Sequence, residues 1–157
     1  MIREMIETEK EIKEVMDIWL ESVINGHVFI SEEYWKNEFN TVKREYLPMS
    51  KTYVYEENEK IKGFISMINE DFIGALFVGV EYQNQGVGHL LLEYIKEKHP
   101  VVKLSVYCKN TAAVRFYRKN GFKIECMEMN EDTGEENYIM GYNTNQRMEN
   151  RKNSLTI

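Results

Sequence analysis

The chain has 157 residues, of which 43% are hydrophobic and 29% charged, and its net charge is −6. This length is typical of one domain with its own hydrophobic core, and this composition excludes a disordered or fibrous protein. The negative charge argues against a nucleic-acid-binding protein, because proteins of that class neutralise phosphates with basic residues.

The N-terminal segment predicts a short strand and then an amphipathic helix. The strand is expected over residues 2–7. Thr8 and Glu11 form the pattern of a capping box, in which Thr8 caps the helix and Glu11 reaches back to it. Gly26 is expected to end the helix. Apolar residues at helical spacing mark its buried face: Ile12, Val15, Met16, Trp19, Leu20 and Val23.

A second helix is predicted between Ser31 and Pro48. Ser31 is a suitable N-cap, because its hydroxyl can accept a hydrogen bond from a free N–H of the first turn. Pro48 should end the helix, since proline lacks the N–H that helix continuation requires. Its apolar positions are Trp35, Phe39, Val42 and Tyr46.

Three strands are predicted next. Residues 52–57 and 61–68 flank the polar turn Asn58-Glu59-Lys60, which is the pattern of a β-hairpin. Residues 72–80 form a third, mostly apolar run that leads into a glycine-containing loop.

The second half of the chain alternates helices and strands. One helix begins near residue 87, and another, over residues 111–119, is ended by Asn120-Gly121. Strands are expected over residues 101–107, 122–129 and 136–142. The apolar face of the first of these helices comprises Val87, Leu90, Leu91, Tyr94 and Ile95.

These elements follow the order β-α-α-β-β-β-α-β-α-β-β. The order predicts one mixed α/β domain over residues 1–142. Residues 143–157 are polar and aperiodic and are expected to form a C-terminal tail.

The sequence shows no signal for a membrane or an oxidising compartment. The N-terminus lacks the apolar segment of a signal peptide, and no apolar run is long enough to span a bilayer. Cys108 and Cys126 lie in no metal-binding pattern, so no metal is expected. Cys126 falls in an alternating apolar pattern and is predicted to be buried, and Cys108 is not expected to be a nucleophile. We therefore expect a cytoplasmic protein with reduced thiols.

The sharpest motif is the turn Gln83-Asn84-Gln85-Gly86-Val87-Gly88, between a predicted strand and a predicted helix. Glycines at alternate positions let backbone N–H groups converge on an anion, and the helix dipole adds positive potential there. His89 and Leu90 follow where a Walker A loop requires Lys and Ser or Thr, and the antiparallel strands before the turn exclude a dinucleotide-binding fold. The turn therefore predicts pyrophosphate binding without a lysine.

A second motif runs from Asn110 to Phe122 and reads N-x-x-A-x-x-x-Y-x-x-x-G-F. With the turn Q-x-x-G-x-G before it, this motif resembles the signature of the GNAT acyltransferase superfamily. The resemblance spans residues 1–142. The segments Trp19-Leu20-Glu21-Ser22 and Gly26-His27 look most like those of small bacterial GNAT acetyltransferases.

The resemblance implies the GNAT fold, a mixed and mostly antiparallel sheet flanked by helices, with acetyl-CoA in the V between two splayed strands. Residues 76–78 and 101–107 would lie in these strands. The pantetheine arm would pair with the backbone of residues 76–78 and contact Asn110, which is also a suitable helix N-cap. The cofactor-binding residues implied are Leu76, Phe77, Val78, Gln83, Asn84, Gln85, Gly86, Val87, Gly88, His89, Asn110 and Tyr117.

Acetyl transfer to an amine requires a neutral amine, donors for the oxyanion of the tetrahedral intermediate and a proton for the departing thiolate. Tyr117 holds the family's acid position, and the backbone N–H of Val78 is the implied oxyanion donor. The family's glutamate base is replaced by Ser105, which cannot serve as a base. His27 is the best alternative base, unless it is a loop histidine or a substrate contact. Weaker candidates are Glu70, Asp71 and Glu81, and a chain of water without a dedicated base is the remaining alternative.

The charge is distributed unevenly along the chain. Residues 1–71 contain nine Lys and Arg against sixteen Asp and Glu, whereas residues 96–123 contain eight basic residues and one acid. This pattern favours an anionic cofactor beside the basic block and a cationic acceptor beside the acidic half. Candidates for the 3′-phosphate of the cofactor are Lys109, Arg115, Arg118 and Lys119. Candidates for attracting the acceptor are Glu32, Glu33 and Glu38, and the aromatic candidates for its pocket or for the core are Tyr34, Trp35 and Tyr53.

The resulting prediction is an N-acetyltransferase that moves an acetyl group from acetyl-CoA to a primary amine. The amine belongs to a protein lysine, a protein N-terminus or a small molecule. The alternative is a non-catalytic acyl-CoA-binding sensor or interaction module. The absence of the family's glutamate base at Ser105 favours this alternative, whereas the presence of Tyr117 argues against it. Nucleic acid and membranes are not expected as partners, and the sequence does not indicate an oligomeric state.

Overall fold

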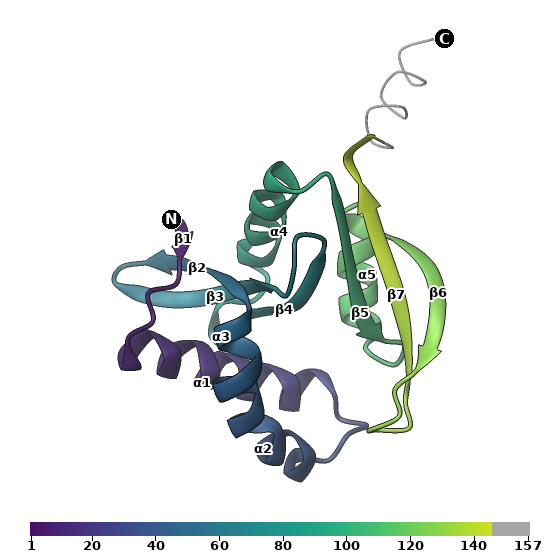
Figure 1. Cartoon of the computed structure of the whole chain (residues 1–157), viewed down its shortest axis with the longest axis horizontal. Helices are drawn as coiled ribbons and strands as arrows, with labels where there is room; N and C mark the ends of the chain where they lie inside the picture. The colour runs from purple at the N-terminus through teal and green to yellow at the C-terminus, as the bar shows by residue number, and fades with distance from the viewer. Residues whose placement is uncertain (146–157) are drawn as a thin grey trace.

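The computed structural model describes residues 1–145 of the chain (Figure 1). The predicted order of helices and strands is confirmed. The predicted second helix continues through two short helical segments, η1 (Val42–Tyr46) and α3 (Leu47–Met49), and one further short segment, η2 (Val80–Tyr82), is added. The longer helices are α1 (Glu9–Gly26), α2 (Glu32–Thr41), α4 (Val87–Lys98) and α5 (Thr111–Lys119). The strands are β1 (Ile2–Glu4), β2 (Lys51–Glu57), β3 (Lys60–Met67), β4 (Phe72–Val78), β5 (Val101–Tyr107), β6 (Lys123–Met129) and β7 (Glu136–Asn143).

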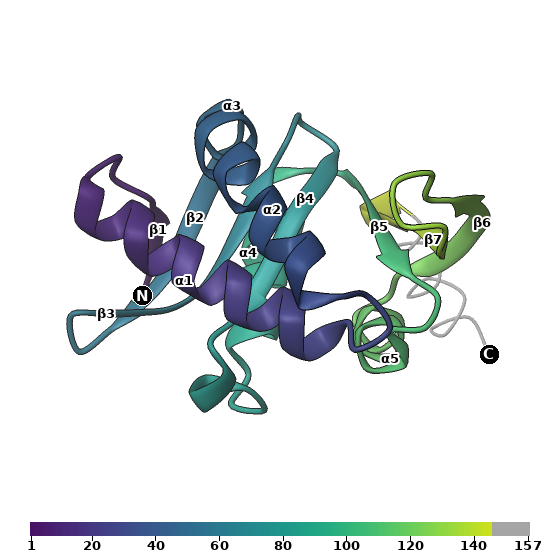
Figure 2. The ribbon, with the colours of Figure 1, turned by 90° about the horizontal axis from the view of Figure 1, so that it is seen from below.

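The described strands form one sheet in the order β1-β2-β3-β4-β5-β7-β6. All neighbouring strands are antiparallel except β4 and β5. These two pair only where Phe72 meets Lys103 and Ile73 meets Leu104. Beyond this contact they diverge, as Figures 1 and 2 show. The mixed, mostly antiparallel sheet with a V between these two strands is therefore confirmed.

Helices cover both faces of the sheet, and a hydrophobic core lies under each cover (Figure 2). Successive residues of a strand point to opposite faces. Tyr53 of β2 accordingly joins the core under α4, whereas Val54 joins the core under α1. The α1 side is built mainly from Val15, Met16, Ile18, Trp19, Val23, Trp35, Leu47 and Phe64, and the α4 side includes Ile65, Leu91, Leu92, Ile95, Leu104, Phe122 and Met140.

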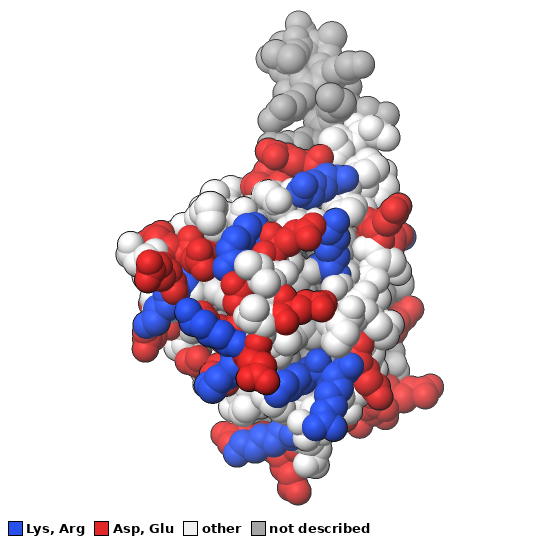
Figure 3. Space-filling view, turned by 60° about the vertical axis from the view of Figure 1, so that its left-hand side comes forward, with Lys and Arg blue, Asp and Glu red and all other residues white. Residues whose placement is uncertain are grey.

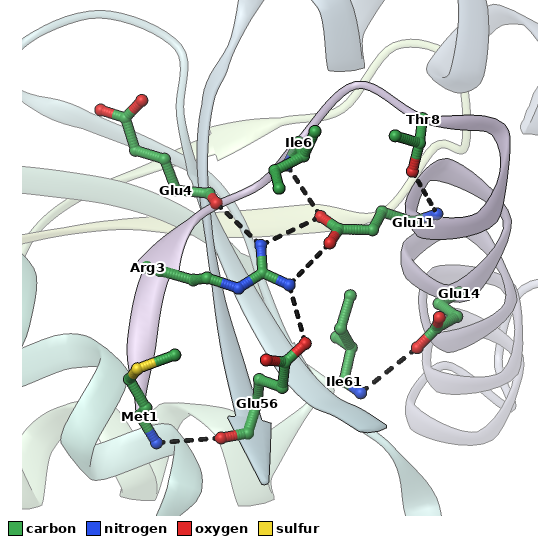
Figure 4. A network of polar contacts seen from close by, with 9 residues as sticks. All are labelled: Met1, Arg3, Glu4, Ile6, Thr8, Glu11, Glu14, Glu56 and Ile61. Atoms are coloured by element: carbon green, nitrogen blue, oxygen red, sulfur yellow. Dashed lines mark hydrogen bonds and ion pairs between the residues drawn. The ribbon is translucent and has the colours of Figure 1, made fainter. Parts of the chain in front are cut away.

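Side chains cap the first two helices at the predicted residues. Thr8 Oγ1 accepts a hydrogen bond from the Glu11 N–H at 3.2 Å, and Ser31 Oγ accepts one from the Tyr34 N–H at 3.2 Å. The reciprocal half of the predicted capping box is wrong. The Glu11 carboxylate instead accepts from the Ile6 N–H and binds the guanidinium of Arg3, because this cation on β1 lies within its reach (Figure 4).

Pro48 does not end the second helix as predicted. In η1 the helix widens, so that the Leu47 N–H donates to the carbonyl of Val42, five residues earlier. This register shift places Pro48 in the first turn of α3, where its missing N–H is tolerated. The helical path ends at Ser50, whose hydroxyl donates to the carbonyl of Tyr46.

The predicted hairpin is confirmed, with a tighter turn. Asn58 and Glu59 both have positive φ angles, 54° and 62°, as a two-residue type I′ turn requires. Lys60 therefore belongs to β3 rather than to the turn. Two other strands are shorter than predicted, since β1 ends at Glu4 and β4 ends at Val78.

Two burial predictions are wrong. Cys126 is exposed, because β6 is an edge strand and a bulge between Ile124 and Cys126 shifts the alternation of its side chains. Leu90 is 46% exposed, whereas Leu92 is buried in the core under α4. Leu90 flanks the buried row that Val87, Leu91 and Ile95 form on one side, and Leu92 flanks it on the other.

No helix within residues 1–145 is both long enough and apolar enough to cross a membrane. The predicted tail of residues 143–157 begins at the last residue of β7, and its residues 146–157 lie outside the described part of the chain.

Candidate active site

The edge of β4 that faces β5 carries free backbone groups beyond the short contact between the two strands. The Gly79 N–H donates a hydrogen bond to the carbonyl of Lys62 in β3, so the backbone polar groups of Gly79 point toward β3. The preceding carbonyl, of Val78, accepts from the side chains of Gln83 at 3.2 Å and Ser22 at 3.4 Å and faces the opposite edge. Because the N–H and C=O of one strand residue point to the same edge, the N–H groups of Leu76 and Val78 open into the V.

The glycine-containing turn bends its backbone sharply before α4. Asn84 and Gly86 have φ angles of 62° and 86°, which lie in the left-handed region. Gly86 precedes α4 without a side-chain cap, so the first N–H groups of this helix are free of a capping side chain. A Cβ atom at Gly86 would meet nothing within 4 Å, so the turn is open there. A turn with free N–H groups, a helix N-terminus and open space at Gly86 can accommodate a bound diphosphate.

Gly88 has a different role. A Cβ atom at this position would lie 3.2 Å from the ring of Phe116. The glycine therefore lets α4 approach α5 closely at Phe116.

A cleft of about 670 Å³ runs along the turn, the open edge of β4 and the N-terminal half of α5. Every residue predicted to bind the cofactor lines this cleft except Gln85, whose amide turns back to the carbonyl of Glu81. Four further residues line this cleft that were not predicted to do so: Tyr82, Ala112, Ala113 and Phe116. Ala113 is the alanine of the N-x-x-A motif, so this position did carry a sequence signal, whereas the other three line the cleft through packing. Ser22, Asn25 and Gly26 at the end of α1 were likewise not predicted to line it.

A second cavity of about 220 Å³ lies between β4, β5 and the helices α1 and α2. Its walls include the rings of Trp19, Trp35 and Tyr107. No Asp, Glu, Lys or Arg of the described chain lines it. The two cavities have six lining residues in common and therefore adjoin: His27, Leu76, Phe77, Asn110, Ala113 and Tyr117.

Tyr117 is 9% exposed and lies at this junction. Its ring packs edge-on against Phe116 and Phe122, with centroid distances of 5.3 and 5.6 Å. Burial raises the pKa of its phenol well above the ordinary value, because a phenolate would be poorly solvated there. Tyr117 therefore keeps its proton at neutral pH.

His27 also lies at the junction and is 7% exposed. Its Nδ1 is 2.9 Å from the carbonyl of Val23, which can only accept, so Nδ1 carries the proton. Its Nε2 then accepts a hydrogen bond from Asn110 Nδ2 at 3.2 Å. Burial lowers the pKa of His27, so the ring is neutral at pH 7.

Asn110 connects this histidine to α5. Its Oδ1 accepts a hydrogen bond from the Ala113 N–H at 3.2 Å, which confirms the predicted N-cap. The same amide donates to His27 through its nitrogen. One side chain thus fixes both the start of α5 and the orientation of the histidine ring.

Other candidates lie apart from the junction. Glu70, Asp71 and Glu81 line neither of the two cavities, whereas Ser105 lines the second. Tyr53 packs against Tyr94 on the α4 side of the sheet, away from the second cavity. Burial raises the pKa of the Cys108 thiol, so this cysteine stays protonated.

The basic candidates for the 3′-phosphate do not line the cleft. Lys109 pairs with Glu135 at 3.0 Å and lies over the ring of Phe29. Arg115, Arg118 and Lys119 are exposed on α5.

Comparison with known proteins bears on the chemistry of this site. The family model "Acetyltransferase (GNAT) domain" matches residues 14–141. The chain is 34% identical over 142 residues to the peptidyl-lysine N-acetyltransferase YiaC of Escherichia coli K12, covering 90% of this chain and 96% of the relative. It is similar to the solution structure of YjaB from Escherichia coli in its apo form, with a TM-score of 0.79, 28% identity and coverage of 90% and 96%.

A third similarity concerns a structure with a bound cosubstrate. A Bacillus anthracis protein described as a streptothricin acetyltransferase, solved in complex with acetyl coenzyme A, matches with a TM-score of 0.54 and 25% identity. The match covers 61% of this chain and 64% of that protein.

Proposed function

Because the chain belongs to the GNAT acetyltransferase family, we propose that it acetylates the side-chain amine of lysine residues in peptides or proteins. The chain is an acetyl-CoA-dependent N-acetyltransferase, and acetyl-CoA supplies the activated acetyl thioester. The similarity to YiaC, whose name specifies peptidyl-lysine, supports lysine as the acceptor.

One observation carries this proposal. The cleft with the free N–H groups and the aromatic cavity adjoin at Tyr117 and His27. The cleft fits a long anionic cosubstrate, and the aromatic cavity fits the alkyl chain of an amine. Their junction is where an acetyl group and an amine would meet.

The cosubstrate would lie along the cleft. The N–H of Leu76 would pair with the pantetheine arm, and those of Asn84 to His89 would bind the pyrophosphate. Gln83 would hold the carbonyl of Val78, to which it is bonded, and Asn110 would contact the arm beside its helix cap. Open space at Gly86 and the uncapped start of α4 support this placement.

Tyr117 would act as the general acid. Its pKa is raised by burial, so it holds its proton at Oη until negative charge develops on the departing sulfur. The N–H of Val78, which opens into the V, would stabilise negative charge on the acetyl oxygen.

His27 is the candidate general base. The ring is neutral and its Nε2 carries the lone pair, but Asn110 occupies this lone pair. His27 can take the amine proton once the amide of Asn110 turns away. Water in the junction remains the alternative route for this proton.

The acceptor class is tested by a panel of amines with acetyl-CoA, read out as release of free thiol. The proposal predicts release with a peptide that carries one lysine and a blocked N-terminus. A matched peptide with norleucine in place of the lysine should give none, and a lysine-free peptide with a free N-terminus should react at least about 10-fold more slowly. Turnover of only small-molecule amines, or tight acetyl-CoA binding with no release from any amine, would contradict it.

Two predictions from the sequence remain proposals. The domain is taken to span residues 1–142, followed by a polar tail, and the protein is taken to act in the cytoplasm.

A further inference from the structure

We propose that Trp35 is a specificity-determining residue, whose indole N–H donates a hydrogen bond to a main-chain carbonyl oxygen of the acceptor lysine. This inference rests on the proposed lysine acceptor and adds a recognition element to it. It explains how the second cavity would tell a lysine residue from a simple alkylamine.

The indole nitrogen of Trp35 is an unsatisfied donor. The side chain is 8% exposed, and its Nε1 is buried without a hydrogen-bond partner in the described part of the chain. Such donors are rare in folded proteins, because a buried N–H that has lost water normally gains another acceptor. Trp35 lines the second cavity, so a ligand oxygen that reaches Nε1 from this cavity would supply the missing acceptor.

The ring of Trp35 is held in place on several sides. It packs against Tyr34 at 5.0 Å, His27 at 5.2 Å, Trp19 at 6.1 Å and Tyr107 at 6.4 Å between ring centroids. Ser31 caps the start of α2, the helix that carries Trp35. A ring fixed in this way presents its N–H in one direction, so it can select for the position of an oxygen.

The distances fit a lysine residue. An extended lysine side chain places its amine about 6 Å from its own Cα, by standard bond lengths. The ring centroid of Trp35 lies 5.2 Å from that of His27, and His27 lies at the junction of the two cavities. A lysine whose amine lies at the junction and whose side chain runs along the second cavity toward Trp35 would therefore place its main chain beside this ring.

The walls of the cavity suit the alkyl chain that joins the amine of a lysine to its main chain. Apart from the polar side chains of His27, Ser105 and Asn110, its described lining is aromatic, aliphatic or glycine and includes no Asp, Glu, Lys or Arg. Four methylene groups can pack against the apolar part, while the buried donor of Trp35 is available to the polar main chain.

The kinetic experiment compares two acceptors of matched length, Nα-acetyl-lysine methylamide and pentylamine. The second has the same alkylamine but no carbonyl. Wild-type protein should prefer the lysine derivative by about 10-fold in kcat/KM, the effect of one buried hydrogen bond. In Trp35→Phe this ratio should fall to about one. In Trp19→Phe, a matched change in the wall of the same cavity, the ratio should stay near the wild-type value.

A second readout does not depend on turnover. The chain has two tryptophans, so the full-length protein gives two indole N–H signals in a nitrogen-correlated NMR spectrum, and the two variants assign them. With CoA present, Nα-acetyl-lysine methylamide should move the Trp35 signal downfield, whereas pentylamine should leave it in place.

The outcomes separate this inference from the proposed function. If the lysine derivative is acetylated but the Trp35 signal does not move and Trp35→Phe keeps the wild-type ratio, the role of Trp35 is overturned and lysine acetylation stands. If the signal moves but the lysine derivative is not acetylated, the proposed acceptor is overturned and the donor role of Trp35 stands. An equal loss for both acceptors in Trp35→Phe would show that the ring only packs, and this also overturns the inference.

Discussion

At the scale of single residues, His27 has a partner on each ring nitrogen, and this fixes its protonation. Val23 holds the proton on Nδ1, and Asn110 donates to Nε2. A protonated ring would have to give up the contact with Asn110, since both groups would then be donors. Neutral His27 and the helix cap of α5 are therefore coupled.

This coupling predicts how stability depends on pH. Burial lowers the pKa of His27 in the folded protein, while in the unfolded chain it stays near 6.5. Below that value the unfolded chain binds the proton more readily, so the free energy of unfolding should fall as the pH drops from 7.5 to 5.5. His27→Gln should lessen this fall, measured by urea unfolding at several pH values. Parallel pH curves for wild type and variant would refute the buried neutral imidazole.

At the scale of elements, the turn before α4 depends on Gly86. Gly86→Ala should raise the KM for acetyl-CoA about 5- to 10-fold, because a Cβ atom there would project into the open cradle and strain the left-handed backbone. Gly134→Ala is the matched control, since Gly134 also has a positive φ angle and open space but lies in the turn between β6 and β7. Both variants should lose similar stability in thermal unfolding. An equal rise in KM for both would contradict a cosubstrate role for the turn.

The helices α4 and α5 are joined by a buried lysine. Lys96 Nζ donates to the carbonyl of Asn120 at the end of α5 and to Glu93 at 3.1 Å, and it lies 4.3 Å from the centre of the Tyr142 ring. The cation therefore faces the negative end of the α5 dipole.

Lys96→Met should lower the free energy of unfolding by about 1–3 kcal/mol, since the carbonyl of Asn120 would lose its charged donor. Lys98→Met removes an exposed lysine from the same helix and should change stability by less than about 0.5 kcal/mol. Denaturant unfolding of the two variants checks this difference. Equal effects would mean that the buried lysine does not join the helices.

At the scale of the whole molecule, charge is more mixed than its distribution along the sequence suggests. Lys96, Lys103 and Lys109 of the basic block pair with Glu93, Glu125 and Glu135. On the side of the molecule shown in Figure 3, basic and acidic side chains are interspersed. A basic side for the anionic cofactor and an acidic side for the cationic acceptor therefore stay a prediction from the sequence.

A network around Arg3 ties the N-terminal parts of the molecule together (Figure 4). Arg3 on β1 binds Glu11 of α1 at 2.6 Å and Glu56 of β2 at 2.7 Å. The hydrogen bonds from Arg3 hold the pKa of Glu11 below its ordinary value. This contribution to stability is present above the unfolded pKa of about 4.3 and is lost as the pH falls through the lowered folded pKa.

Glu11→Gln should therefore cost about 1–3 kcal/mol at pH 7, and the difference from wild type should shrink as the pH is lowered below 4. Asp17→Asn, which breaks the exposed pair with Lys13, should cost less than about 0.5 kcal/mol at any pH. Chemical unfolding at pH 7 and pH 3.5 tests both. A Glu11→Gln deficit that is independent of pH would contradict the role of the Arg3 pair.

The order of the elements and the glycine-containing turn before α4 could be predicted because they depend on local patterns. Thr8, Ser31 and Asn110 cap their helices through neighbours three residues away, and the spacing of apolar residues marks the faces of α1. The bulge that exposes Cys126 depends on the pairing of β6 with β7, and the pair between Arg3 and Glu11 depends on how β1 and α1 pack together. The wide turn that admits Pro48 has no local sequence pattern that marks it. The unpartnered indole N–H of Trp35 likewise becomes visible only when β4, β5, α1 and α2 are assembled.

The central claim is that Tyr117 supplies a proton where the two cavities adjoin, and turnover of Tyr117→Phe tests it most directly. With acetyl-CoA and a lysine peptide, kcat should fall by about 100- to 10,000-fold, while the affinity for acetyl-CoA changes less than about 3-fold. Tyr94→Phe, a change of the same kind on α4, should keep the wild-type rate. If Tyr117→Phe also turns over at the wild-type rate, Tyr117 is not the acid and the account of the site is contradicted.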